Sequence, residues 1–348
     1  MPSVAPGAAD RGLLSIVIKA YNEEAKIAQA LQSALAAAAE IAPLRLEVVL
    51  ADSCSQDRTV DIARGFPVRI VQFENPAQRS CGAGVQLGYA ASRGEWVYLM
   101  DGDMSLSPGF LQDALACLRL DPGLAGVGGA VVDERISNGF DLIRVRNRSG
   151  SRDGEHPWLE GGGLYRRAAI DSAGGYAADI NLKGYEEAEL GLRLGAAGWR
   201  LRRLAREAVR HVGHDADTFT LLRRHWASGR AFSAGVMLRQ ALGRPWLARA
   251  LYLHRHPLAL GLWWLLLPGL VFLGPFALAL WLGAGLAVAL SLAVVKRSLR
   301  HAGVSLFSWH YALAAIARGW FEPRRDPTVP LPAREIARPP GRPSPCST

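Results

Sequence analysis

Apolar runs alternate with helical segments through the first 132 residues of the chain. Five of these runs read as buried strands, at 13–20, 46–52, 68–73, 95–101 and 124–132. The segments between them predict helices, at 24–41, 55–65 and 84–92 and from near Pro108 onward. Strands that are apolar throughout and separated by helices are typical of a parallel sheet covered on both faces. The pattern therefore predicts a Rossmann-like α/β domain with a mainly parallel sheet.

The part of the chain that follows is less regular. Residues 133–160 are polar and Arg-rich, and they predict a long loop. The segment "WLEGGGLYRRAAIDSAGGY" (158–176) predicts a Gly-rich turn, a short helix and a second Gly turn. The segment "GYEEAELGLRLGAAGWRL" (184–201) predicts a helix with three glutamates in its first turn. Acidic side chains at that position interact favourably with the helix dipole, which is their simplest explanation.

A long uncharged segment follows residue 257. Residues 258–295 contain no charged side chain, and a bilayer crossing needs about 20 apolar residues. The segment therefore predicts two transmembrane helices joined near Gly274-Pro275. Basic residues flank the pair at both ends, namely Arg255, Lys296, Arg297 and Arg300. This charge pattern predicts that both ends of the hairpin lie on the cytoplasmic side.

The remaining segments are shorter. Residues 296–321 are amphipathic and Trp-containing, which predicts a helix in the membrane interface or a third crossing. The tail at 322–348 is rich in Pro and Arg and predicts disorder. Disorder is also predicted for residues 1–12, which lack an apolar signal region. The N-terminal domain is therefore expected in the cytoplasm.

The charge balance narrows the class of partner. The chain has 40 Lys and Arg against 31 Asp and Glu, a net charge of +9, which favours anionic partners. Thirteen arginines but three acids lie between Arg193 and His256, directly before the apolar segment. Residues 219–257 therefore predict a basic amphipathic region at an anionic membrane surface, or a solvated face, rather than nucleic-acid binding. The four cysteines form no CxxC pair, which predicts free thiols.

Acidic residues follow three of the predicted strands. The segment "LMDGDMSLSP" sets Asp101 and Asp103 one residue apart, where a divalent cation would offset their repulsion. A polar turn in which Asp103 caps the next helix is the alternative. Residues 21–23 and Asp52 follow two other strands. Because ligands bind at the carboxyl ends of parallel strands, these positions predict one shared crevice.

Five segments resemble family 2 glycosyltransferases of the GT-A fold. They are "SIVIKAYNEE", "LADSCSQDRT", "YLMDGD", "EGGGLYRR" and "GYEEAELGLRL". Their order and spacing are those of the family, and the resemblance covers roughly residues 13–215. It implies a GT-A-type catalytic domain at 13–218, with a mixed, mainly parallel sheet. The two-span C-terminus is similar to that of membrane-attached members that act on lipid-linked acceptors.

The resemblance implies a nucleotide-diphosphate sugar as donor and Mg²⁺ or Mn²⁺ as cofactor. Donor contacts carry over to eight positions: Ala20, Tyr21, Asn22, Glu23, Asp52, Arg79, Asp101 and Gly102. Among these, Asp52 would accept a hydrogen bond from the base, whereas Arg79 approaches the base or diphosphate or is solvated. Asp103 would hold the metal, with Asp101 beside it. A hard cation prefers such oxygen ligands and bridges the diphosphate oxygens.

The general base carries over to the acidic start of "GYEEAELGLRL". Its second acid, Glu187, would deprotonate the acceptor hydroxyl, with Glu186 and Glu189 as alternatives. His211 follows "EAVRH", where the family often places a further metal ligand; a structural histidine is the alternative. The segment "RRHWASGR" lacks the Gln of the processive QxxRW signature, so a single transfer is expected.

The sequence thus predicts an inverting, metal-dependent transferase of the inner membrane. It would move one sugar to a lipid-linked, polyprenyl-type acceptor at the cytoplasmic face. A nucleotidyltransferase shares a similar sheet and acidic site, but its Gly-rich basic signature is missing near the N-terminus. A non-catalytic, membrane-anchored module that binds a nucleotide sugar is the other alternative. The aspartate pair and the three glutamates argue against it.

Overall fold

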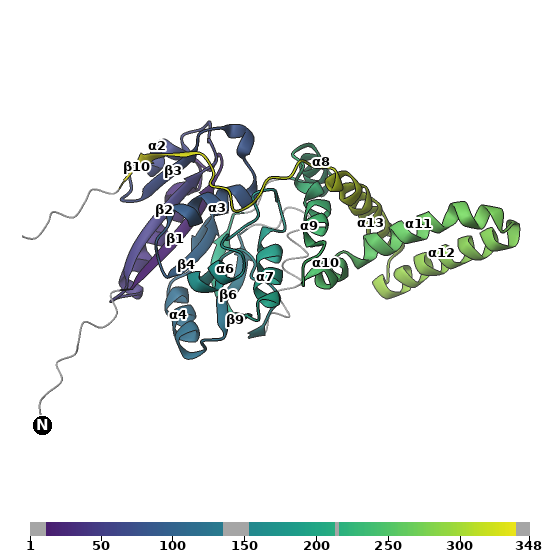
Figure 1. The fold of residues 1–348 in the computed structure, drawn as a ribbon, viewed down its shortest axis with the longest axis horizontal. Coiled ribbons are helices and arrows are strands. Elements are labelled where there is room, and N and C mark those ends of the chain that lie inside the picture. Colours follow the sequence, from purple (N-terminus) through teal and green to yellow (C-terminus); the bar gives the residue numbers. More distant parts are fainter. Residues whose placement is uncertain (1–11, 135–152, 213–215, 339–348) are drawn as a thin grey trace, which may run out of the picture. The chain divides into compact units, whose positions relative to one another are not determined.

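The computed structural model describes residues 12–134, 153–212 and 216–338 (Figure 1). The chain divides into two compact units, Met1–Arg224 with Arg324–Thr348, and His225–Pro323. The predicted disorder at 1–12 and at 339–348 falls almost entirely outside the described residues.

A mixed β-sheet forms the centre of the first unit. Its ten described strands are β1 (Leu13–Ala20), β2 (Arg45–Asp52), β3 (Arg69–Phe73), β4 (Trp96–Asp101), β5 (Met104–Leu106), β6 (Leu124–Asp133), β7 (Gly154–Glu155), β8 (Gly163–Arg166), β9 (Arg200–His211) and β10 (Ala333–Ala337). The order is β10-β3-β2-β1-β4-β8-β6-β9-β5, and β7 pairs with β9. The neighbours β3, β2, β1 and β4 are parallel, as are β6 and β9. All five predicted strands are present within this arrangement.

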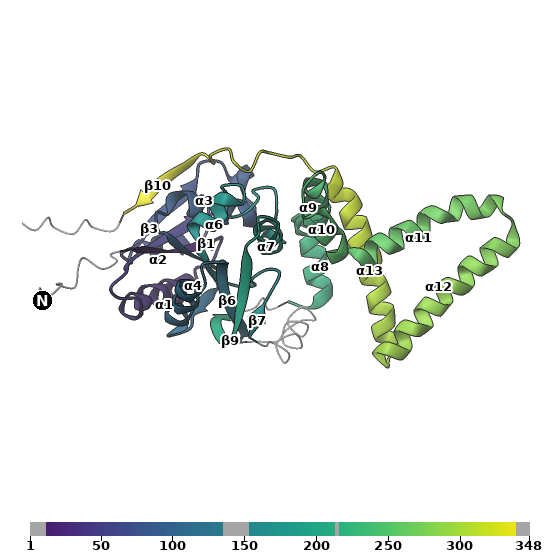
Figure 2. The ribbon, with the colours of Figure 1, turned by 60° about the horizontal axis from the view of Figure 1, so that its bottom comes forward.

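Helices cover both faces of this sheet (Figure 2). The described helices of the first unit are α1 (Ile27–Glu40), α2 (Thr59–Ala63), α3 (Cys81–Ala91), α4 (Phe110–Leu120), α6 (Arg167–Ser172) and α7 (Glu186–Ala196), with a 3₁₀ turn at Pro76–Gln78. Helices α1, α2 and α4 lie on one face of the sheet, and α3, α6 and α7 lie on the other. Side chains alternate along β1 accordingly, so that Ile16 and Ile18 join one core and Val17 the other.

Two predictions about irregular segments are corrected. Most of the predicted loop at 133–160 lies outside the described residues, but Gly154–Glu155 pairs with β9. The predicted Gly-rich turn contains β8, which lies antiparallel between β4 and β6. This strand has four residues, two of which face each way, so it shows no recognisable period.

The prediction of a disordered C-terminal tail, at 322–348, is wrong for its central part. Residues Ala333–Ala337 form β10, which pairs antiparallel with β3 at the edge of the sheet, where Figure 2 shows it in yellow. A Pro- and Arg-rich composition predicts disorder only when the segment has no partner. Here the unpaired edge of β3 supplies backbone hydrogen bonds to it.

The second unit is helical. It contains α9 (Ser233–Ala241), α10 (Leu247–Leu253), α11 (Arg255–Phe272), α12 (Pro275–Lys296), α13 (Leu299–Trp320) and a 3₁₀ turn at Arg230–Phe232; α8 (Thr218–Ala227) leads into it along the chain. In the described part of the chain, two helices are long and apolar enough to cross a bilayer, namely α11 and α12. Their large apolar side chains are mostly exposed, which suits contact with an apolar partner or with lipid. Both helices match the predicted spans.

Two glycines fix the packing of α13 on α9. A Cβ at Gly235 would lie 2.1 Å from the carbonyl oxygen of Ile316, and one at Gly319 would lie 2.0 Å from that of Phe232. The two helices therefore approach backbone to backbone, which small residues permit. The amphipathic segment predicted at 296–321 corresponds to α13.

Candidate active site

The register of the parallel strands gathers the predicted acidic positions. Ala20 lies opposite Asp52 across β1 and β2, and Lys19 lies opposite Asp101 across β1 and β4. The backbone continues this contact, because Gly102 N donates to the carbonyl oxygen of Lys19 over 2.8 Å. The carboxyl ends of three strands thus form one edge, as expected for such sheets.

The loops after β1 and β2 are bound to each other at this edge. Asn22 N donates to Ser55 Oγ over 2.9 Å, and Gln56 N donates to Asn22 Oδ1 over 2.8 Å. Glu23 N donates to Thr59 Oγ1 over 2.8 Å. Asn22 has a φ of 56°, a left-handed conformation that Asn tolerates better than most residues. Residues 20–23, which are predicted to contact the nucleotide-sugar donor, therefore lie in a backbone segment that these hydrogen bonds hold in place.

Asp52 lies fully buried beside these loops. Its Oδ2 accepts from Ser55 N over 3.0 Å and from Gln72 Nε2 over 2.7 Å. Within the described residues, its Oδ1 has no hydrogen-bond partner. A buried acceptor without a donor is costly unless a ligand supplies one. The exposed ring of Tyr21 stands at the same edge, with the guanidinium carbon of Arg79 4.5 Å from its centroid.

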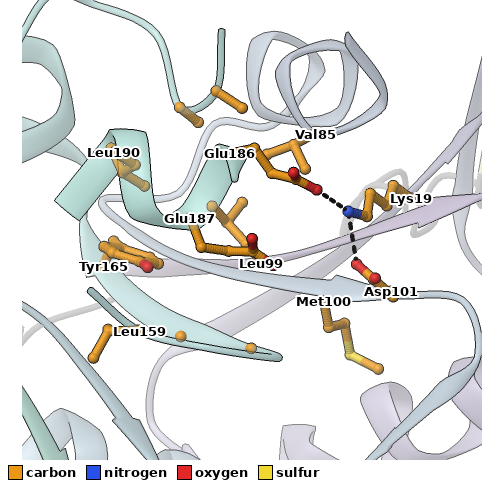
Figure 3. A pocket seen from close by; sticks show the side chains of 14 residues that line it. Lys19, Val85, Leu99, Met100, Asp101, Leu159, Tyr165, Glu186, Glu187 and Leu190 are labelled. Atoms are coloured by element: carbon orange, nitrogen blue, oxygen red, sulfur yellow. Dashed lines mark hydrogen bonds and ion pairs between the residues drawn. The ribbon is translucent and has the colours of Figure 1, made fainter. Parts of the chain in front are cut away.

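Lys19 forms the centre of a second cluster, shown in Figure 3. Its Nζ lies 2.7 Å from Glu186 Oε1 and 3.1 Å from Asp101 Oδ1. Burial alone would lower the pKa of Lys19, but the charges of Asp101 and Glu186 raise it above its ordinary value. Burial raises the pKa of Asp101, and Lys19 opposes that shift. The lysine therefore stays charged and neutralises these two acids.

The three glutamates of the first turn of α7 have different surroundings. Glu189 accepts two hydrogen bonds from the buried Arg193, at 2.6 and 3.1 Å, while Glu186 is paired with Lys19. Glu187 lines a pocket together with the apolar side chains of Leu99 and Leu190 (Figure 3). Burial and the neighbouring charge of Glu186 raise the pKa of Glu187 to about 8. Of the three, Glu187 has the environment that a general base near neutral pH needs.

A third cluster joins Asp103 to His211. His211 Nε2 lies 3.2 Å from Asp103 Oδ2, and its Nδ1 lies 2.8 Å from Asp133 Oδ1. The strand pairing explains this, because His211 is opposite both Asp133 on β6 and Met104 on β5. Asp103 is not a helix cap, as the alternative interpretation had it. The following helix α4 begins at Phe110, with Gly109 at its N-cap.

The residues around Asp103 fit a divalent cation. Burial and the charges of Asp103 and Asp101 raise the pKa of Glu23 to about 7, which shows how much negative charge accumulates here. Among the described residues, no three acidic, His or Cys side chains form a complete metal cage. A carboxylate with one imidazole is a partial ligand set that Mg²⁺ or Mn²⁺ would accept, with the remaining positions open to other oxygen ligands. Asp101, the other predicted ligand, is instead paired with Lys19.

Sequence reasoning missed several residues that complete these clusters. Asp133 is the first residue of the predicted loop at 133–160 and has no predicted role, and Gln72 lies inside an apolar run. A polar residue within an otherwise buried strand was the available signal for Gln72. No local signal connected Asp133 to His211, which lies 78 positions further along the chain.

Comparisons with known proteins agree with this geometry. Residues 15–156 match the model of the family described as glycosyl transferase family 2. An uncharacterized glycosyltransferase of Haemophilus influenzae is 24% identical over 132 residues, which cover 38% of this chain and 43% of that protein. The succinoglycan biosynthesis protein ExoO of Rhizobium meliloti is 32% identical over 98 residues, 27% of this chain and 26% of that protein. The matches thus span less than half of these relatives.

A solved structure extends the comparison to the fold. The mannosyltransferase PcManGT from Pyrobaculum calidifontis, in complex with GDP-Man and Mn²⁺, superposes with a TM-score of 0.56. The alignment covers 92% of this chain and 90% of that chain, at 21% sequence identity. At this identity the likeness concerns the fold.

Proposed function

We propose that this protein transfers a single sugar from a nucleotide-diphosphate sugar to a membrane-bound, lipid-linked acceptor. The chain carries a domain of glycosyl transferase family 2 with the GT-A fold, and the proposal proceeds from that. The observation that carries the proposal is the meeting of three acidic clusters at one sheet edge. Each cluster offers what one part of the reaction needs, namely a buried acceptor at Asp52, a metal-ligand pair at Asp103 and His211, and a base at Glu187.

The donor would bind along the carboxyl ends of β1, β2 and β4. Asp52 Oδ1 would accept a hydrogen bond from the base, and Tyr21 and Arg79 would contact the base or ribose. Gly102 lets the backbone after β4 pack closely on the end of β1, because a Cβ there would lie 3.0 Å from the Cβ of Ala20. Mg²⁺ or Mn²⁺ held by Asp103 and His211 would offset the charge of the departing diphosphate.

Inversion needs one base on the acceptor side of the sugar. Glu187 would take the proton of the acceptor hydroxyl as its oxygen forms a bond to the anomeric carbon. The bond from that carbon to the diphosphate breaks, and the nucleoside diphosphate leaves with the electron pair. A pKa near 8 lets Glu187 accept this proton and remain protonated until product leaves. Glu186 is engaged in its ion pair with Lys19, so that it does not compete with Glu187 for this proton.

The proposed acceptor class rests on the chain that follows the catalytic domain. The apolar helices α11 and α12 attach the domain to a bilayer, and basic residues flank them at both ends. Both ends then lie in the cytoplasm, with the arginines of 219–257 near anionic headgroups. An acceptor hydroxyl or phosphate on a lipid is held at the same surface as the enzyme.

The experiment uses membranes that contain the full chain. They are incubated with Mn²⁺ and a panel of radiolabelled nucleotide sugars, and the lipids are then extracted. Label in the lipid fraction, with release of an equal amount of nucleoside diphosphate, supports the proposal. Label only in water-soluble product overturns the lipid acceptor. Donor binding without nucleoside diphosphate release favours the non-catalytic module, and pyrophosphate release from a sugar phosphate and a nucleoside triphosphate favours a nucleotidyltransferase.

A further inference from the structure

The C-terminal strand β10 is joined to the donor side of the sheet by side chains as well as by backbone. Arg334 lies opposite Gln72 in the β10–β3 pairing. One residue on, Glu335 Oε2 lies 2.9 Å from Arg69 Nη2, and this half-buried pair fixes the register. Earlier in the same segment, Arg325 N donates to Asn181 Oδ1, and Asn181 Nδ2 donates back to the carbonyl oxygen of Arg325, both over 2.8 Å.

A chain of hydrogen bonds leads from β10 to Asp52. Arg334 Nη2 donates to Gln72 Oε1 over 2.7 Å, and Gln72 Nε2 donates to Asp52 Oδ2 over 2.7 Å. Arginine only donates and a carboxylate only accepts, so the amide of Gln72 satisfies both neighbours in one orientation alone. Arg334 and Asp52 therefore hold the amide of Gln72 in the same orientation from its two ends.

These hydrogen bonds leave Asp52 with a single oxygen that can still accept a hydrogen bond. Oδ2 receives two hydrogen bonds, from Gln72 and from Ser55 N, whereas Oδ1 receives none from the described residues. A buried donor without a partner in the same residues, Arg79 Nη1, belongs to the residue that stands over Tyr21. Among the described residues, the region after β1 and β2 thus holds one buried acceptor, Asp52 Oδ1, and one buried donor, Arg79 Nη1, that the protein leaves without a hydrogen bond.

We propose that Gln72 and Arg334 are positioning residues. They hold the Asp52 carboxylate so that only one of its oxygens, Oδ1, accepts a hydrogen bond from the nucleotide base. The inference rests on the proposed nucleotide-sugar site. Uracil presents one N–H between two carbonyl oxygens, which matches one acceptor beside a donor. Guanine presents two adjacent N–H groups and needs two acceptors, of which Oδ2 is already occupied. The segment that follows the membrane helices in the chain thereby becomes part of donor selection.

The test measures binding of UDP and GDP to the full chain in detergent by calorimetry, with Mn²⁺ present. Wild type is expected to bind UDP more tightly than GDP. Arg334→Met is expected to weaken the binding of UDP about fivefold to tenfold and to reduce the ratio of UDP to GDP affinity. The reason is that the side-chain amide of Gln72 loses its hydrogen bond from Arg334 and can rotate away from Asp52. Arg334→Lys restores part of the ratio, since lysine still donates to Gln72 Oε1.

Two further variants separate positioning from folding. Arg338→Met is the matched control, because Arg338 follows the same strand and binds Glu335 instead of Gln72. Its affinities for UDP and GDP are expected to stay within about twofold of those of wild type. Gln72→Glu has the same shape and still accepts from Arg334, but cannot donate to Asp52, so it lowers the ratio even if Arg334→Met does not fold.

The outcomes are distinct. The inference is overturned if Arg334→Met binds UDP and GDP with the same affinities as the control Arg338→Met. A wild type that prefers GDP also overturns it. A uniform loss of both affinities together with a lower melting temperature assigns Arg334 a structural role and also overturns it. Failure of wild type to bind either nucleotide contradicts the proposed donor site itself.

Discussion

Two clusters of carboxylates lie at the same sheet edge, but the nitrogen-bearing side chains that join them differ. Asp101 and Glu186 share Lys19, whose Nζ lies within 3.1 Å of both. Asp103 and Asp133 share His211, through its two ring nitrogens. Lysine carries a proton on its only nitrogen near neutral pH, whereas a neutral imidazole presents one donor and one lone pair.

The difference indicates what each cluster can do. The lysine cluster is neutralised internally, which leaves Glu187 as the adjacent acid with a raised pKa. In the histidine cluster, an Nδ1 proton directed at Asp133 leaves the Nε2 lone pair facing Asp103 over 3.2 Å. Two lone pairs at that distance require a proton or a metal cation between them. In the proposed function, the first cluster would serve proton transfer and the second would hold the metal cation.

The largest effect is expected at the histidine cluster. Asp103→Ala removes the carboxylate ligand, and metal-dependent transfer falls by about four orders of magnitude, equivalent to about 5 kcal/mol of transition-state stabilisation. The measurement is nucleoside diphosphate release across a Mn²⁺ titration. Asp113→Asn is the control, because Asp113 is exposed and pairs with Arg206 on the outside of α4. Normal turnover by Asp103→Ala would falsify the metal assignment.

Glu187→Gln tests the lysine cluster. The amide keeps the shape of the side chain but cannot take the acceptor proton, so kcat falls about 10²- to 10⁴-fold. The Kd of the donor, measured by calorimetry, stays within about twofold. A nearly normal kcat would transfer the role to Glu186 or Glu189, although both are tied to a cation.

Asp133→Asn is expected to weaken the histidine cluster while leaving both proposed metal ligands, Asp103 and His211, unchanged. The Asn side chain still accepts a hydrogen bond from His211 Nδ1, but as a neutral group it makes the imidazole a poorer ligand. Mn²⁺ affinity, measured by electron paramagnetic resonance, is expected to fall about 10- to 100-fold. Donor-free protein is used, so the readout does not depend on turnover. An unchanged Mn²⁺ affinity would make His211 a structural histidine.

The smallest effect concerns stability. Since the folded-state pKa of Glu187 is raised to about 8, above the ordinary 4.5, the folded protein loses stability as the pH rises through this window. The amide introduced by Glu187→Gln does not titrate, so this variant is more stable than wild type above pH 8 by about 2–5 °C, and equally stable near pH 4. Melting temperatures of the full chain across pH 4–9 check this, with the exposed Glu155→Gln as control. A difference that does not grow with pH would contradict the assigned pKa.

Much of the site followed from the pattern of the strands. Continuous apolar runs predicted parallel strands, and parallel strands place their carboxyl ends at one edge, so the convergence of Ala20, Asp52 and Asp101 was predictable. The partners of these residues were not. Lys19 is not among the predicted site residues, although its Nζ lies between two acids that are 82 and 167 positions away.

The sequence by itself determined the periodic features, namely the α/β domain, the acidic strand ends and the two apolar helices. Local chemistry suffices for these, because strand burial and helix hydropathy depend on neighbouring residues. Only the tertiary structure decided the pairing of His211 with Asp133, of Lys19 with Glu186, and of β10 with β3. A charged group or a strand edge takes whichever partner the fold places within about 3 Å, and nothing in the local sequence encodes that choice.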